Sequence, residues 1–103
     1  MDNGGGAGRM ARWALMMENP PGPGAWHLFE LMATVDGTHE EAVERFAEFV
    51  RLYRPKHPRY PVRMRRYRTA DGWMVIGDGS SGGSFPYRFS ISELEWDSGP
   101  ISY

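Results

Sequence analysis

Basic residues are concentrated in one segment of this 103-residue chain. Seven arginines and one lysine lie between positions 51 and 68, and no aspartate or glutamate interrupts them. Within this segment Arg63, Arg65 and Tyr67 occupy every second position, so a β-strand would place the three side chains on one face. Guanidinium groups bind phosphates and aromatic rings stack on exposed bases, so this combination is typical of single-stranded nucleic-acid binding.

Two observations weigh against nucleic acid as the preferred ligand. The formal net charge is −1, whereas nucleic-acid domains usually carry a clear positive excess. Arg66 and Arg68 can also be neutralised by ion pairs across neighbouring strands, and the partners expected for them are Glu93 and Glu95. Single-strand binding therefore stands as an alternative hypothesis. It would use Arg63, Arg65, Tyr67 and Arg88, with help from Arg59.

A glycine-rich segment, residues 77–82, has the spacing G-x-G-x-x-G. In dinucleotide-binding proteins that spacing opens a helix, but here a strand-like segment from Phe85 follows, so we interpret residues 77–84 as a polar hairpin loop. Backbone amides and hydroxyl groups of such a loop can bind an anion. The candidate anion-binding residues are Gly79, Ser80 and Ser81. A further alternative is a small-ligand protein or enzyme in which this loop covers a pocket near Trp73 and His27.

No other group of side chains has the spacing of a catalytic or metal site. The chain has no cysteine, which excludes thiolate metal ligands and thiol nucleophiles. Its three histidines, His27, His39 and His57, show no spacing typical of metal ligands, and no G-x-S-x-G elbow is present. The sequence therefore predicts a protein without enzymatic activity, metal or cofactor.

One long helix is predicted over residues 38–54. Thr38 and Glu41 match the capping box, in which each side chain accepts a hydrogen bond from the other residue's backbone amide. Pro55 ends the helix, because the residue before a proline disfavours helical dihedral angles. Apolar residues recur at the helical period and predict a buried face made of Val43, Phe46, Ala47, Val50 and Tyr53.

The remaining segments have the patterns of β-strands. Five strands are predicted, over residues 11–18, 26–35, 60–69, 73–76 and 85–91. An Asp71-Gly72 pair predicts a tight hairpin turn with positive φ between the third and fourth strands. The core face of the second strand is predicted to consist of Phe29, Leu31, Ala33 and Val35. The order β-β-α-β-β-β predicts an α+β fold, a mostly antiparallel five-stranded sheet with one helix packed on one face.

Composition predicts one domain over residues 10–97. A disordered glycine-rich leader is expected at residues 1–9 and a flexible tail at residues 98–103. No apolar run is long enough to span a bilayer, so we expect a soluble cytoplasmic protein without membrane contact.

One helix covers only one face of such a sheet, so the opposite face must meet solvent or a partner. We expect large apolar, aromatic and guanidinium side chains there, and these types are enriched at protein interfaces. The partner-binding residues assigned to this face are Trp26, Leu28, Met32, Arg63, Arg65, Tyr67 and Arg88. The sequence thus predicts a small non-catalytic interaction protein that forms a homodimer or binds another protein. Phe49 and Leu52, at the edge of the helix's apolar face, offer an alternative contact between copies.

Overall fold

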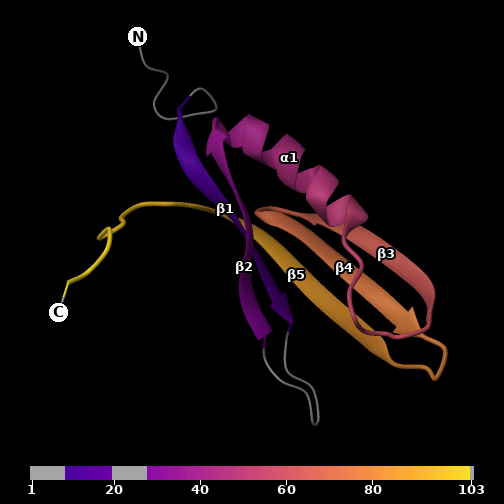
Figure 1. Cartoon of the computed structure of the whole chain (residues 1–103). Coiled ribbons are helices and arrows are strands. Elements are labelled where there is room, and N and C mark those ends of the chain that lie inside the picture. Colours follow the sequence, from indigo (N-terminus) through magenta and orange to yellow (C-terminus); the bar gives the residue numbers. More distant parts are fainter. Residues whose placement is uncertain (1–8, 20–27, 103) are drawn as a thin grey trace.

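Five antiparallel strands form a single sheet with one helix on one face (Figure 1). The computed structural model describes residues 9–19 and 28–102. The strands are β1 (Ala11–Asn19), β2 (Leu28–Gly37), β3 (Pro61–Thr69), β4 (Gly72–Gly79) and β5 (Ser84–Glu93), and the helix is α1 (His39–Leu52). This architecture confirms the predicted α+β class.

The strands lie in the order β2-β1-β5-β4-β3. Two hairpins join β3, β4 and β5, and β5 then pairs with β1, so the last strand lies in the middle of the sheet. The strict alternation of apolar and polar residues in β5 fits this central position, because only one of its faces is covered by the helix layer. The edge strands are β2 and β3, and no residue of β3 is buried.

The helix begins where its capping signals predict. The backbone amide of Thr38 donates to Oε1 of Glu41 at 2.8 Å, and the amide of Glu41 donates to Oγ1 of Thr38 at 3.1 Å, which completes the capping box. Tyr53 is the C-cap, two residues before Pro55. The prediction of one capped helix is therefore confirmed, and its last residue, Leu52, comes two residues before the predicted end at residue 54.

The core lies between α1 and the face of the sheet beneath it. Three helix residues, Ala42, Phe46 and Val50, are buried there. Their neighbours from the sheet are Trp13, Leu15 and Met17 of β1, Trp73 and Val75 of β4, and Tyr87 and Phe89 of β5. Within each of these strands the buried residues occupy every second position, so they share one face of the sheet.

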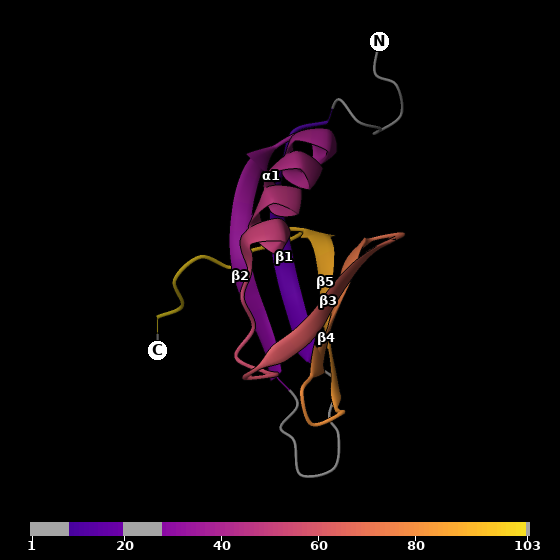
Figure 2. The same cartoon turned by 90° about the vertical axis from the view of Figure 1, so that its right-hand side faces the viewer.

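The helix covers only part of that face. It packs against β1 and β2, and the views of Figures 1 and 2 show the β3–β4 hairpin extending beyond it. The connection from α1 to β3 crosses the remaining area, where Pro58 is buried against Gly77 and Gly79 of β4. An added Cβ at Gly77 would lie 2.6 Å from Cδ of Pro58, so glycine permits this close approach. An open strip is left between the end of α1 and β3.

A β-bulge in β2 changes which of its residues face the core. Leu15 of β1 faces Ala33 of β2. The next residue, Met16, faces Leu31, so Met32 is an extra residue without a counterpart in β1. After the bulge, odd-numbered residues of β2 face the helix side of the sheet. Before the bulge, even-numbered residues face that side and odd-numbered residues face away from it.

The bulge overturns part of the predicted assignment of β2. Ala33 and Val35 pack against the core as expected. Phe29 and Leu31 were also predicted to be core residues, but their exposed fractions are 60% and 56%. Met32 was predicted on the opposite face and instead packs against the core. Strict period-two alternation fails here because one inserted residue reverses the face of all preceding ones.

The turn between β3 and β4 also differs from its prediction. The turn residues are Ala70 and Asp71, and neither has a positive φ; Gly72 is already the first residue of β4. A Cβ on Gly72 would lie 1.9 Å from the carbonyl oxygen of Phe89 in β5. Glycine is therefore required for a close approach between strands and not for a left-handed turn.

Candidate functional site

The face of the sheet turned away from α1, called here the outer face, carries a row of side chains across all five strands. Residues paired across a β-ladder point to the same side. The register places Phe29 beside Glu18, and Glu18 beside Arg88. Met74 follows, between Arg88 and Tyr67. Within residues 9–19 and 28–102, no helix or further strand lies over this face (Figure 2).

Four of the predicted partner-binding residues are brought together on the outer face. Arg63, Arg65 and Tyr67 of β3 face Asp78, Ile76 and Met74 of β4, and Arg88 of β5 lies across from Met74. The other three predicted residues do not join them. Met32 packs against the core, Trp26 lies outside the described residues, and only the backbone of Leu28 is described.

The structure adds apolar side chains that sequence reasoning placed elsewhere. Phe29 and Leu31 of β2 are both more than half exposed on the outer face. Met16 of β1 lies beside Leu31, and Met74 and Ile76 of β4 are half-buried on the same face. The bulge in β2 produced this change, and no residue type in the segment signals it.

Arg65 and Arg88, two of the guanidinium groups on the outer face, have carboxylate partners. Arg65 Nη2 lies 3.1 Å from Oδ2 of Asp78, and Arg88 Nη2 lies 3.2 Å from Oδ2 of Asp71. The hydroxyl of Ser84 donates to Oδ1 of Asp78 at 2.7 Å. That hydrogen bond, followed by the charge of Arg65, lowers the pKa of Asp78 below its ordinary value, so the carboxylate stays charged at neutral pH. The two ion pairs make the centre of this face close to neutral.

The glycine-rich turn between β4 and β5 has little capacity left to hold an anion. The amide of Gly79 donates to the carbonyl oxygen of Gly83 at 2.8 Å, and the amide of Ser80 donates to that of Tyr60 at 3.2 Å. Both predicted amide donors are therefore occupied by backbone partners. Anion binding at Ser81 stays a prediction.

This turn does not cover a pocket near Trp73. Trp73 lies at the start of β4 and Gly79 at its end, and six residues of a strand span about 20 Å. His27, the other residue expected at that pocket, lies outside the described residues. The alternative of a small-ligand site closed by this loop therefore gains no support.

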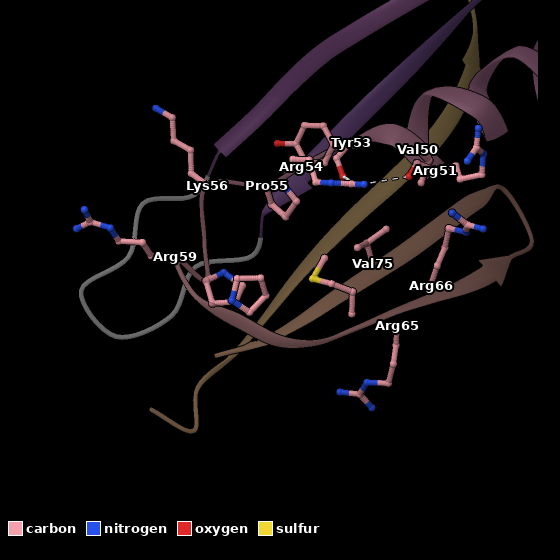
Figure 3. A pocket seen from close by; sticks show the side chains of 13 residues that line it. Val50, Arg51, Tyr53, Arg54, Pro55, Lys56, Arg59, Arg65, Arg66 and Val75 are labelled. Atoms are coloured by element: carbon pink, nitrogen blue, oxygen red, sulfur yellow. Dashed lines mark hydrogen bonds between the residues drawn. The ribbon is translucent and has the colours of Figure 1, made fainter. Parts of the chain in front are cut away.

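A second surface was not predicted as a site. A groove with a volume of about 870 Å³ lies between the end of α1, the connection to β3, and the helix side of β3 and β4 (Figure 3). Its lining includes the basic residues Arg51, Arg54, Lys56, Arg59, Arg65 and Arg66, and no acidic residue. We call it the basic groove. Sequence reasoning found the basic run but not its concave arrangement, which depends on how the connection folds back over the sheet.

Two of the six basic residues are neutralised outside the basic groove. Arg51 pairs with Glu48, one helical turn earlier, and Arg65 pairs with Asp78 on the outer face. Figure 3 shows Arg66 directed from β3 toward the end of α1, whereas Arg65 points to the other side of the strand. In the part of the chain that the structure describes, no carboxylate binds the remaining four, Arg54, Lys56, Arg59 and Arg66.

The ion pairs predicted between β3 and the end of the chain do not form. β3 is an edge strand that pairs only with β4, so β5 and the residues after it are not its neighbours. Glu93 forms an ion pair with Arg9 instead. Arg68 donates to the carbonyl oxygen of Gly72 at 2.8 Å and lies over the Trp73 ring. The prediction failed because it required β3 to lie beside β5.

Neither a metal centre nor a family assignment narrows the function further. Within the described residues, no three or more histidine, aspartate or glutamate side chains gather in a way that could hold a metal ion, and no helix is long and apolar enough to cross a membrane. Comparison with protein-family models, with curated proteins and with solved structures gave no match.

Proposed function

We propose that this protein is a small non-catalytic interaction protein that forms a homodimer through the outer face of its sheet. The exposed apolar side chains on that face carry the proposal. Phe29 and Leu31 are 60% and 56% exposed, and Tyr67 on the opposite edge strand is 47% exposed. An apolar area of this kind, on a sheet face that no second layer covers in the described residues, is typical of a contact site.

The charges of the outer face favour a second copy as the partner. A two-fold symmetric interface uses the same surface twice, so that surface must be complementary to itself. Arginine and aspartate alternate across this face in three neutral pairs, Arg65–Asp78, Arg88–Asp71 and Arg12–Asp36. A face on which these pairs place both signs side by side does not need a partner of opposite charge, and nucleic acid would have to displace these carboxylates.

The size of the sheet is sufficient for a stable dimer. Five strands about 4.8 Å apart, each about nine residues long, cover roughly 20 by 30 Å. The accessible surface of such an area approaches the ~800 Å² that each partner buries in a standard protein interface. Self-association through this face is therefore compatible with a specific contact.

Two leucines with equal exposure allow the proposal to be tested against its closest competitor. Leu31 lies on the outer face and Leu52 at the edge of α1, and each is 56% exposed. We expect the unmodified protein to be a dimer by light scattering across a wide concentration range. Leu31→Lys should weaken the dimer at least about tenfold, because a buried leucine contributes roughly 1.5–3 kcal/mol. Leu52→Lys should leave the dimer unchanged.

The opposite result for the two leucine variants would assign the interface to the edge of α1. Loss of the dimer in Leu52→Lys alone would overturn the assignment to the outer face, and a monomer at all concentrations would overturn self-association. Tyr67→Ala provides an independent test on β3, and it should weaken association while the circular dichroism spectrum of the folded protein stays unchanged. Circular dichroism of each variant separates loss of contact from loss of fold.

A further inference from the structure

We propose that the basic groove binds a phosphate-bearing nucleotide unit, either as a free nucleotide or within a single strand of nucleic acid. Its unneutralised positive charge is the first observation. The four basic residues without a carboxylate partner in the described part of the chain all line one concave surface. Figure 3 shows Arg54 and Arg66 beside the groove, whereas the side chains of Lys56 and Arg59 extend outward at its end. The whole molecule carries a net charge of −1, so this local excess of positive charge distinguishes the basic groove from the rest of the surface.

Two arginines on opposite walls define where a phosphate would bind. Nη1 of Arg54 donates to the carbonyl oxygens of Arg51 at 3.5 Å and Tyr53 at 3.3 Å. These acceptors are uncharged, so they hold the Arg54 guanidinium across the basic groove without cancelling its charge (Figure 3). Arg66 extends from β3 toward the end of α1, on the other side of the groove (Figure 3). A phosphate between the two would receive charge-assisted hydrogen bonds from both.

The floor of the basic groove is apolar. Val50 of α1 and Val75 of β4 are buried beneath it, and Met64 of β3 is 44% exposed at its side. Tyr53 forms part of the wall and is fixed by Phe89, whose ring centroid lies 5.3 Å away. Burial raises the pKa of Tyr53 above its ordinary value, so its phenol adds no negative charge. Apolar and flat groups below a basic rim suit a base attached to a phosphate.

The connection that forms one wall of the basic groove is attached to the sheet. The hydroxyl of Tyr87 donates to the carbonyl oxygen of His57 at 2.9 Å. Pro58 is buried over the glycines of β4, and the His57 ring stacks on Phe85 with centroids 6.0 Å apart. A ligand would therefore meet a wall that is already formed, which reduces the ordering cost of binding.

The shape favours a nucleotide over other anions. A volume of about 870 Å³ exceeds what an inorganic phosphate fills and lies in the range of small-molecule sites. A concave groove accepts an individual molecule or an extended strand, whereas a flat bilayer would contact only its rim. The basic groove lies on the helix side of the sheet, so its ligand and the proposed dimer use different surfaces. Experiments can therefore refute either proposal without refuting the other.

The test uses two arginines of β3 that point to opposite faces. Arg66→Glu changes the basic groove, and Arg63→Glu makes the same charge change on the outer face. Binding of a fluorescently labelled oligothymidylate and of labelled ATP is measured by anisotropy at several salt concentrations. We expect Arg66→Glu to weaken binding at least about tenfold, the loss typical of one charge-assisted contact, and Arg63→Glu to weaken it less than about threefold.

Labelled ATP and labelled oligothymidylate distinguish a free nucleotide from a single strand of nucleic acid as the ligand. Tight ATP binding with a shallow salt dependence supports a free nucleotide. Oligothymidylate binding with a steep dependence supports a single strand, and Arg66→Glu should then lower the log-log slope by about 0.7. Equal losses in both variants would overturn the assignment to the basic groove. No binding of either probe, or tighter binding to phosphatidylserine-containing vesicles, would overturn the proposal.

Discussion

Arg65 and Arg66 are neighbours of the same type in β3, and they lie in opposite electrostatic environments. Arg65 points to the outer face and is held 3.1 Å from a carboxylate oxygen of Asp78. Arg66 points to the helix side and is bound by no carboxylate in the described residues. The same basic run therefore supplies charge to a neutral face and to a positive groove. Counting charges along a strand says little until its two faces are separated.

The two faces of the sheet differ in the same way in their apolar content. On the helix side, Phe89 of β5 is completely buried under α1. On the outer face, Phe29 of β2 is 60% exposed. Both are phenylalanines in strands of one sheet, so the difference between their exposed fractions shows how much burial the helix layer provides.

The largest expected effect tests this contrast directly. Phe89→Ala should lower the free energy of unfolding by about 3–5 kcal/mol, because it removes a fully buried ring and leaves a cavity. Phe29→Ala should cost the folded monomer less than about 1 kcal/mol, since most of that side chain already contacts water. Urea unfolding of both variants at a low protein concentration checks the difference.

Dimerisation would change only the stability cost of Phe29→Ala. If Phe29 lies in a dimer interface, the cost of its replacement should grow with protein concentration, because association stabilises the folded state by mass action. A large cost at low concentration would show that Phe29 belongs to the core after all, and the bulge in β2 would then be wrong.

An intermediate effect is expected at the start of the helix. Thr38→Ala removes the side-chain acceptor for the Glu41 amide and should destabilise the protein by about 1 kcal/mol. Thr34→Ala makes the same chemical change at an exposed position of β2 and should cost less than about 0.5 kcal/mol. Thermal unfolding of the pair checks whether the helix side depends on this cap. Equal costs would assign the effect to threonine itself and not to capping.

Sequence reasoning succeeded where the signals are local. The helix was predictable because its capping box and Pro55 lie within a few residues of the ends they determine. The face of β5 was predictable because strict alternation continues without interruption in a central strand. Arg63, Arg65 and Tyr67 could be placed on one face for the same reason.

Sequence reasoning failed where a feature depends on distant segments. Phe29, Leu31 and Met32 are all apolar, so nothing in their types shows that β2 contains a bulge. The position of β3 at the edge depends on β5 pairing with β1, and this pairing decided which carboxylates the arginines meet. The basic groove requires the connection after α1 to fold back over β4, which a pattern of prolines and arginines does not specify.

The smallest expected effect concerns the pH dependence of the outer face. The hydrogen bond from Ser84 and the charge of Arg65 lower the pKa of Asp78 in the folded state. A carboxyl group with a lowered folded pKa stabilises the protein above its unfolded pKa, which is about 3.9, and this contribution is lost as the pH falls through the folded value. Asp78→Asn should therefore be less stable than the unmodified protein at pH 7, by less than the effect of Thr38→Ala.

The two proteins should converge in stability as the medium is acidified. The difference begins to shrink near pH 5, where the carboxyl group of the unfolded chain starts to take up protons, and it disappears once the folded carboxyl group is protonated as well. Urea unfolding at a series of pH values measures this convergence. A difference that stays constant down to pH 2 would mean that asparagine disturbs the turn or the Ser84 hydrogen bond, and that the Arg65–Asp78 pair does not neutralise the outer face.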